Sequence, residues 1–412
     1  MKFLLSFTAL GMVVFSDGKV PPKKVAAIVT EYRHNSHADV IVGRLLQTYT
    51  LDDKGERPNL KLVSLYLDQT PENDTGYKWA KKYGVPIHKT IHGALTLGSG
   101  KLAVDGVLLI AEHGNYPRNA FGSQAYPKRR FFEETQKVFR ESGHSVPVFV
   151  DKHLSDNWAD AKWCYDVSRE LDFPLLAGSS LPLLWRYPPQ DVSKNAELQD
   201  ILVTTYHSPD AYGLHALEVL QCLVERRAGG ETGVRRVRCL EGDAVWQAGK
   251  EGLYDPKLLE AAIARTKHHS AQLGKRPLEQ LVKKPILFHI QYRDGLKANI
   301  INLDGATWEW CAAWREKGKE NVQSTLFWTQ EKRPYGHFTF LVQGIEKTFH
   351  SGSTVWPTER TLLTTGLLDA LLRSKSKGGE IIETPHLAIP YKSDWSWKEP
   401  PAPPKERPWN KQ

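Results

Sequence analysis

A lysine and a histidine in this chain could together handle the proton of a substrate hydroxyl. Lys152 follows the apolar run at residues 146–150, and His215 lies within Tyr-Gly-Leu-His-Ala-Leu-Glu, residues 212–218. An imidazole has a pKa near neutrality, so His215 could accept a proton from a carbinol hydroxyl. A nearby ammonium such as that of Lys152 would stabilise the alkoxide that forms. The alternatives are a strand-end lysine that reaches solvent and a hydrogen-bonded structural histidine.

The elements that would hold this pair alternate between apolar runs and helical segments. The runs typical of buried parallel strands are residues 25–29, 60–67, 104–110, 146–150 and 173–177. Helices are predicted at residues 36–47, 73–83, 131–142 and 157–171. This alternation predicts an α/β fold whose first domain is a Rossmann-like, doubly wound parallel sheet. Such sheets bind their ligands at the carboxyl ends of the strands.

The second half of the chain has a different pattern. Candidate strands at residues 201–206, 234–240, 286–292, 296–303, 324–328 and 338–342 are separated by turns and a few helices. They predict an α+β domain with an open, mainly antiparallel sheet. A leucine-rich helix at residues 357–374 could pack back on the first domain. We therefore expect an N-terminal extension at 1–23, domains at 24–190 and 191–394, and a proline-rich tail at 395–412.

Composition limits the classes of function. The net charge of +8 is spread over 412 residues without a long basic run, so nucleic-acid binding is not expected. Residues 1–15 have the charged start and short apolar stretch of a secretory signal, and the stretch is too short for an ordinary membrane span. The protein is therefore expected to be either exported or cytoplasmic. The four cysteines show no metal-like spacing.

Residues 60–110 resemble the Gfo/Idh/MocA family of glucose–fructose oxidoreductases and inositol dehydrogenases. The matching pieces are the strand ending at Asp68, Ala-Lys-Lys-Tyr-Gly-Val-Pro at residues 80–86, and Val-Asp-Gly-Val at residues 104–107. The family continues with a strand ending in Glu-Lys-Pro, which looks like Asp-Lys-His at residues 151–153 here. The similarity covers residues 25–225 well and is fainter afterwards. It implies NAD or NADP as cofactor, a sugar or cyclitol as substrate, and a homo-oligomer.

The resemblance assigns roles to particular residues. Lys152 matches the lysine that polarises the reacting hydroxyl, and His215 matches the histidine that takes its proton. The aspartate of the family's Asp-x-x-x-His pattern falls on Ala211, with Asp210 one residue out of step. A one-residue displacement on a helix turns a side chain by about 100°. Glu112 and His113, which follow a strand, match the region that contacts the nicotinamide ribose.

The turn expected to hold the cofactor pyrophosphate departs from the family. Residues 30–38 contain no glycine, although the dinucleotide fingerprint needs glycines for close backbone approach. Beside Thr30, the side chains of Arg33, His34 and Asn35 could donate hydrogen bonds to a phosphate, or they could fill the pocket instead. Asp68 stands where an acidic residue would accept the ribose hydroxyls.

Four strand-end and helix residues could alternatively converge on a metal ion, although their spacing does not demand one. They are Asp151, His153, His207 and His215. No metal is predicted, and Asp151 is assigned to the cofactor side of the site.

The function expected from sequence is a divergent oxidoreductase that transfers a hydride between a nicotinamide cofactor and a sugar, cyclitol or related polyol. Two alternatives stay open. One is a lyase or hydrolase that acts on oxidised carbohydrates with the same scaffold. The other is a binding protein that has lost the chemistry. Lys152 and His215 favour an enzyme, whereas the missing glycines and the displaced aspartate favour the alternatives.

Overall fold

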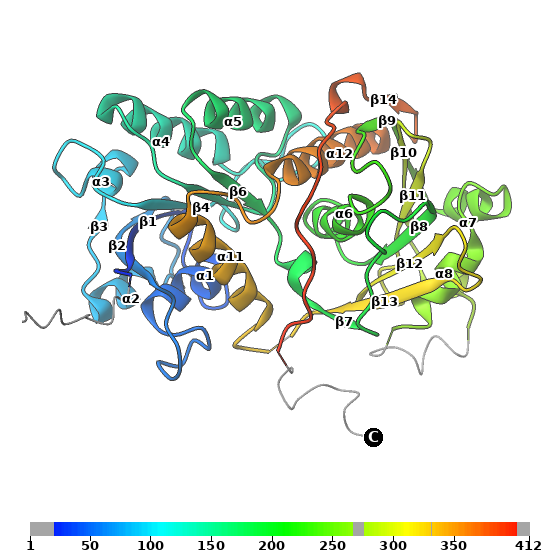
Figure 1. Cartoon of the computed structure of the whole chain (residues 1–412), viewed down its shortest axis with the longest axis horizontal. Helices are drawn as coiled ribbons and strands as arrows, with labels where there is room; N and C mark the ends of the chain where they lie inside the picture. Colours follow the sequence, from blue (N-terminus) through cyan, green and yellow to red (C-terminus); the bar gives the residue numbers. More distant parts are fainter. Residues whose placement is uncertain (1–19, 267–275, 331, 402–412) are drawn as a thin grey trace, which may run out of the picture.

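The computed structural model describes residues 20–266, 276–330 and 332–401. Two sheets lie side by side in Figure 1, and helices cover them and fill the space between them. The first sheet is parallel and the second is mainly antiparallel, which confirms the predicted fold class. Within the described residues, we find no helix with the length and apolar character needed to cross a membrane.

The first sheet has six parallel strands in the order β3-β2-β1-β4-β5-β6. The strands are β1 (Lys23–Val29), β2 (Leu60–Leu67), β3 (Ile87–His88), β4 (Gly106–Ile110), β5 (Val148–Asp151) and β6 (Leu175–Gly178). The central residues of β1, β4, β5 and β6 are buried because helices cover both faces, as the apolar sequences of these strands predict. The order of the strands changes direction between β1 and β4, where doubly wound sheets bind ligands.

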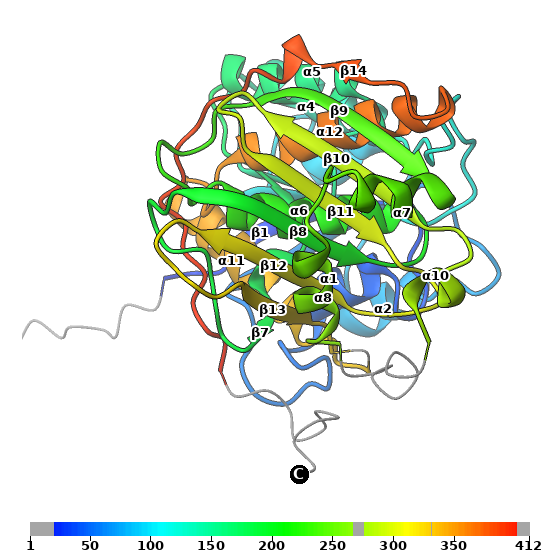
Figure 2. The same ribbon diagram turned by 90° about the vertical axis from the view of Figure 1, so that its right-hand side faces the viewer.

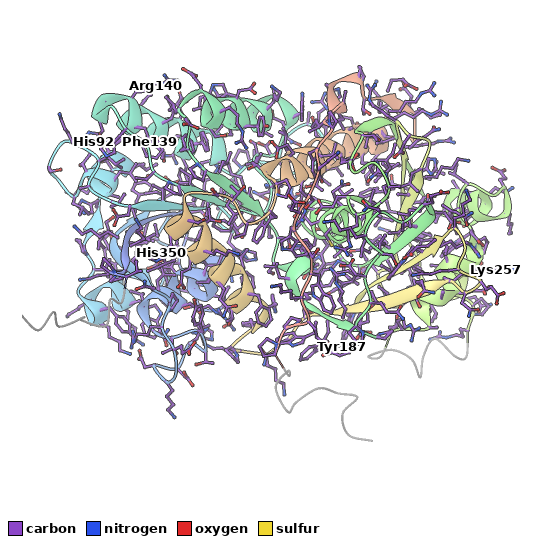
Figure 3. All side chains as sticks on the ribbon, viewed as in Figure 1. His92, Phe139, Arg140, Tyr187, Lys257 and His350 are labelled. Carbon is purple, nitrogen blue, oxygen red and sulfur yellow. The ribbon has the colours of Figure 1, made fainter. Side chains whose placement is uncertain are left out.

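Five helices connect these strands. They are α1 (His37–Leu46), α2 (Gly76–Tyr83), α3 (Ile91–Thr96), α4 (Lys128–Ser142) and α5 (Trp158–Glu170). Ser36 and Asn157 cap α1 and α5 by accepting backbone N–H groups with their side chains. Side chains fill the space between sheet and helices: Phe139 of α4 is buried, whereas the neighbouring Arg140 reaches solvent (Figure 3).

The second sheet has eight strands in the order β14-β9-β10-β11-β8-β12-β13-β7. Its strands are β7 (Trp185–Tyr187), β8 (Leu198–Thr205), β9 (Val234–Glu241), β10 (Ile286–Tyr292), β11 (Lys297–Asn302), β12 (Trp310–Glu316), β13 (Gln323–Trp328) and β14 (Ile382–Glu383). Neighbouring strands are antiparallel except β8 and β11. The outer face carries α7 (Asp243–Lys250), α8 (Pro256–Ile263) and α10 (Leu278–Leu281) (Figure 2). The inner face packs on α6 (Ala211–Val224), which lies between the sheets.

Two later helices return to the first sheet. The expected strand at residues 338–342 is wrong, because this segment begins α11 (His337–Ser351). Its buried residues Phe338, Leu341, Val342 and Ile345 recur at helical spacing and join the core of the first sheet. α12 (Thr358–Ser376) then packs against both α5 and α6. Residues 310–316, which the sequence analysis did not assign to a strand, form the buried β12.

Candidate active site

Lys152 is held by a buried carboxylate at the carboxyl edge of the first sheet. It follows β5, while Glu112 follows the neighbouring β4, so the two side chains emerge at the same edge. The Lys152 Nζ lies 2.9 Å from Glu112 Oε2, and Lys128 Nζ, from the first residue of α4, lies 3.1 Å from Oε1. Lys128 also donates to the carbonyls of Asp151 and His153. This network fixes the position of the Lys152 ammonium.

The charges of the network stabilise one another. Burial alone would raise the pKa of Glu112, but Lys152 and Lys128 hold that pKa well below its usual range. Burial would lower the pKa of Lys152, and Glu112 and Asp151 more than offset it, so the pKa of Lys152 is raised. Lys152 is therefore a fixed cation at neutral pH. Its backbone adopts a left-handed conformation, with φ at 59°, which costs of order 1 to 3 kcal/mol for a side chain of this kind.

His215 lies on α6 and faces the end of the first sheet. Its Nδ1 is 2.6 Å from the hydroxyl of Ser179, which follows β6. Burial lowers the pKa of His215 well below its usual value, and the positive charge of Lys152 lowers it further. The ring is therefore neutral at pH 7 and has a nitrogen that can accept a proton. Ser179 was not among the residues predicted from the sequence.

Asp210 does not orient His215 in the way the resemblance implied for an aspartate. It precedes α6, accepts the backbone N–H of Gln124 at 3.0 Å and lies 4.0 Å from Arg118. Burial raises the pKa of its carboxyl group. Ser179 instead holds the ring of His215. Asp210 thus faces the loop after β4.

A small polar cavity lies between the Lys152 side of the site and Asp210. Its volume is about 90 Å³. It is lined by Glu112, Arg118, Gln124, Tyr126, Lys152, His153, Ser208, Asp210, Ala211 and Leu214. Burial raises the pKa of the Tyr126 phenol, so Tyr126 presents a neutral hydroxyl to the cavity. The lining can donate and accept hydrogen bonds, as recognition of a hydroxylated ligand requires.

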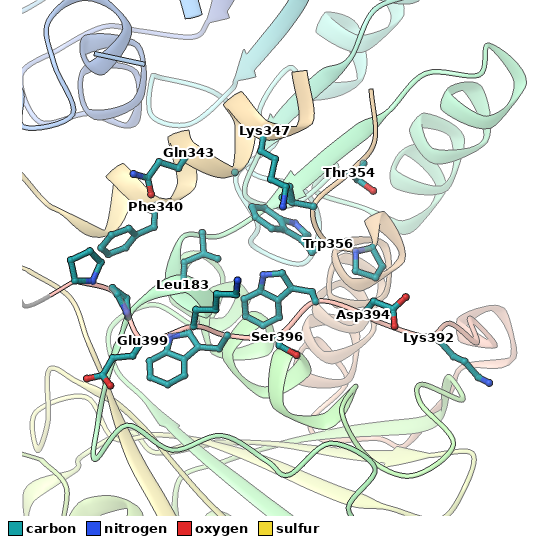
Figure 4. Close-up of a pocket in the computed structure, with 18 residues that line it drawn as sticks. Leu183, Phe340, Gln343, Lys347, Thr354, Trp356, Lys392, Asp394, Ser396 and Glu399 are labelled. Carbon is teal, nitrogen blue, oxygen red and sulfur yellow. The ribbon is translucent and has the colours of Figure 1, made fainter. Parts of the chain in front are cut away.

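A larger cavity, of about 760 Å³, lies elsewhere, between α11 and residues 392–401 (Figure 4). Phe340 and Lys347 of α11 form one side, and Trp356 lines it with an indole N–H that donates to the carbonyl of Ala177. Lys152, His215 and Asp210 do not line this cavity. Lys152 and Asp210 line the smaller cavity, whereas His215 lines neither cavity.

The turn after β1 is filled by contacts within the chain. Thr30 donates its hydroxyl to the carbonyl of Glu112 at 2.7 Å, which ties the end of β1 to the end of β4. Arg33 pairs with Glu31 at 2.6 Å. The backbone N–H of Asn35 donates to the buried Asp39 carboxylate at 2.9 Å, and His34 lies 3.8 Å from the same group. Of the side chains expected to donate to a phosphate, that of Arg33 is paired with Glu31, that of Asn35 accepts from Arg333 at 3.1 Å, and that of His34 is largely exposed.

Asp68, the expected ribose acceptor, is saturated with donors. Tyr66 and Tyr116 donate their hydroxyls at 2.6 and 2.8 Å, and Arg130 lies 2.5 Å away. Burial would raise the pKa of Asp68, but these hydrogen bonds and the arginine lower it.

One further histidine, which was not among the residues predicted from the sequence, lies at the carboxyl edge of the first sheet. His37, the first residue of α1, has its Nδ1 2.6 Å from the carboxylate of Asp151. Its ring also meets the edges of His113 and Phe338, with centroids 5.4 and 5.1 Å away. Burial lowers the pKa of His113 to about 3. His37 stands directly after the Ser36 cap, and this position was the signal in the sequence that could have pointed to it.

The candidate metal ligands go to different partners. Asp151 binds His37, His207 stacks on Tyr212, and His215 contacts Ser179. His153 is buried and lines the small cavity. Among the residues whose structure is described, no group of three histidine, cysteine or acidic side chains could hold a metal ion.

These contacts determine whether the nicotinamide cofactor implied by the resemblance fits the site. A dinucleotide across the ends of β1 and β4 would have to displace the Thr30, His37 and Asp68 contacts. The start of α1, where its pyrophosphate would lie, already holds the buried Asp39 carboxylate, which accepts the N–H of Asn35 and pairs with Arg333. The residues present therefore do not fit a dinucleotide in the position that this type of sheet normally uses.

The sequence matches no family model, and it matches no curated protein. Solved structures do match. GenD2 from gentamicin A biosynthesis, in complex with NAD, aligns with 90% of this chain and 99% of its own at 12% identity, with a TM-score of 0.56. A putative myo-inositol dehydrogenase from Sinorhizobium meliloti 1021 aligns over 88% and 99% at 14% identity (TM-score 0.53).

An aldose-aldose oxidoreductase from Caulobacter crescentus, complexed with glycerol, covers 88% of this chain and 99% of its own at 12% identity (TM-score 0.51). At such low identity these likenesses show the fold alone. The protein therefore has the fold of the Gfo/Idh/MocA-type sugar and inositol dehydrogenases, as the sequence resemblance predicted.

Proposed function

We propose that this protein is an enzyme that acts by acid–base catalysis on a hydroxylated carbohydrate, cyclitol or related polyol. The observation that carries the proposal is the Lys152 ammonium, held on the buried Glu112 carboxylate beside a polar cavity. The fold supports the substrate class, because solved proteins that share it include sugar and inositol dehydrogenases. Pairing of two copies through the second sheet stays a prediction.

The roles of the side chains follow from their charges. Lys152 stabilises negative charge on a substrate oxygen, because its raised pKa keeps it cationic. His215, neutral at pH 7, accepts a proton. Asp210, on the other side of the cavity, binds a substrate hydroxyl or returns a proton, since burial raises its pKa.

Two reactions use such a site, and the first is the dehydrogenation that the fold suggests. It removes a hydride from the carbon that bears the hydroxyl and needs NAD or NADP as acceptor. The contacts across the ends of β1 and β4 argue against the usual binding of that acceptor.

The second reaction is an elimination, and the same contacts favour it because it needs no hydride acceptor. A base removes the proton on the carbon next to a carbonyl or carboxylate, and the C–H electrons pass into that group to give an enolate. The enolate electrons then return to form the carbon–carbon double bond as the C–O bond of the next carbon breaks, and that hydroxyl leaves as water with a proton from an acid. Lys152 would stabilise the enolate that forms between the two steps.

The test is a turnover screen of the full-length protein against polyols, cyclitols and sugar acids. Proton NMR follows the substrates with and without added NAD and NADP. Lys152→Met should reduce turnover at least about 100-fold, the scale of lost charge and proton-transfer catalysis. The control is Lys162→Met on the exposed side of α5. Equal turnover by wild type and Lys152→Met would remove Lys152 from the mechanism.

A further inference from the structure

The segment that follows β4 crosses over the carboxyl end of β1. We call residues 113–126 the cover loop. β1 lies between β2 and β4 in the sheet, so a segment that leaves β4 and bonds to residues after β2 must pass above β1. Asn115 does so through two hydrogen bonds with Gln69, at 3.0 and 2.9 Å, and Tyr116 donates to Asp68 at 2.8 Å. The cover loop thus lies across the path of a dinucleotide bound at the switch point.

The far side of the cover loop is fixed as well. The amide of Asn119 donates to the carboxylate of Asp156 at 3.1 Å, before α5. The backbone N–H of Gln124 donates to Asp210, before α6. Gly114, within the loop, has φ of 105°, and a Cβ there would lie 2.6 Å from the ring of Tyr116. The loop is therefore tied to three elements and has a turn that only glycine fits.

The surface below the cover loop lacks the features that attract a pyrophosphate. Asp39 lies in the first turn of α1 and is fully buried. Its carboxylate supplies the negative charge that a helix N-terminus favours, which is the charge that a bound anion would otherwise supply. Arg333 donates to the Asp39 carboxylate at 2.6 Å, so the charges of this pair already satisfy each other. A phosphate here would have to compete with Asp39 for this helix end.

The nicotinamide end of the crevice is also occupied. His37 and His113, which follow β1 and β4, are in contact across the switch point. Asp151 holds His37 in this position with a bond of 2.6 Å. A nicotinamide ring could reach the end of β4 only after His37 had moved.

We infer that the cover loop and the side chains beneath it occupy the dinucleotide crevice, so that the protein binds neither NAD nor NADP there. The reaction at Lys152 is then redox-neutral and uses the small cavity that the cover loop helps to line. This last consequence rests on the proposed function, whereas the closed crevice does not.

The experiment is a titration of the full-length protein with NADH and then NADPH, followed by tryptophan fluorescence. A solved dehydrogenase of the same fold serves as the positive control. We expect no saturable quenching up to about 1 mM, the weak end of specific binding. The supernatant of the denatured protein should contain no dinucleotide. Saturable binding or a retained dinucleotide would overturn the inference.

Hydrogen exchange measured by mass spectrometry tests the loop itself. Peptides covering residues 113–126 should exchange at the same rate with and without 1 mM NADH, a concentration at about the weak limit of specific binding. The double variant Gln69→Ala/Tyr116→Phe should exchange faster in these peptides and still bind no NADH, because Asp39 remains. Protection by NADH, or unchanged exchange in the variant, would contradict the assignment. A gain of NADH binding by the variant would support the loop as the blocking element and remove Asp39 from that role.

The outcomes separate the two proposals. Nicotinamide binding together with Lys152-dependent turnover would end the closed-crevice inference and leave the acid–base site standing. Absence of nicotinamide binding together with turnover that ignores Lys152 would do the reverse.

Discussion

Lys152 Nζ and Glu112 Oε2 lie 2.9 Å apart at the ends of two neighbouring parallel strands, and both side chains are buried. A second lysine, Lys128, contacts the other carboxylate oxygen. The carboxylate therefore supports two cations, and the cation that lines the cavity depends on it. Several of the consequences below can be measured without knowledge of the substrate.

Glu112→Gln should lower the free energy of unfolding by about 3 to 5 kcal/mol at pH 7, because it leaves buried lysines without a counter-charge. The pKa of Glu112 is depressed in the folded protein, so its contribution is present above its unfolded pKa of about 4.3. That contribution is lost as the pH falls through the depressed value. Urea unfolding at several pH values measures the difference, with the exposed Glu133→Gln as control.

His153→Gln should make the protein less sensitive to acid. Burial lowers the pKa of His153 to about 3 in the folded protein, against about 6.5 in the unfolded chain. Between these values the unfolded chain binds more protons, so wild type loses stability as the pH falls. The variant lacks this loss, and its stability relative to wild type should rise from pH 7 to pH 4. If the difference is independent of pH, the ring is not buried as described. The control is the exposed His92→Gln.

Ser179→Ala should affect the acid–base chemistry without unfolding the protein. The hydroxyl of Ser179 lies 2.6 Å from His215 Nδ1 and also accepts the backbone N–H of Leu181 at 3.1 Å, so its loss costs two hydrogen bonds, about 2 kcal/mol. The pH profile of turnover should shift, because the bond no longer orients the ring. A profile that keeps its shape and position would make the serine purely structural. The reference variant is Ser376→Ala at the exposed end of α12.

Gly366→Ala tests the close contact between the two parts of the chain. A Cβ at this position of α12 would lie 2.4 Å from Leu387 and 2.7 Å from the ring of Trp158, before its neighbours move. Overpacking of this kind costs about 1 to 3 kcal/mol, more than the gain in helix propensity. The variant should unfold at lower urea concentration than wild type, and equal midpoints would mean that the helices do not meet so closely.

Much of the fold could be predicted because most strands of the first sheet are apolar runs, and because α1, α3 and α5 begin after residues whose side chains cap them. Lys152 and His215 could be selected because strand ends and helix faces are readable from local pattern. Lys128 could not be selected, because a lysine at the first position of a helix normally reaches solvent. Its burial depends on contacts with residues at the ends of β4 and β5, which the local sequence does not show. The same limit explains residues 338–342, whose aromatic and aliphatic side chains suit a strand locally but form a helix against α1.

α11 belongs to the core of the first sheet although it follows β7–β13 of the second sheet in the chain. During synthesis, β6 therefore leaves the ribosome long before the helix that completes its sheet. At about 5 to 20 residues per second the interval is roughly 10 to 35 seconds. One face of the parallel sheet is incompletely covered throughout this time, so a nascent chain that ends before Phe338 should be a chaperone client, and the N-terminal half expressed alone should aggregate.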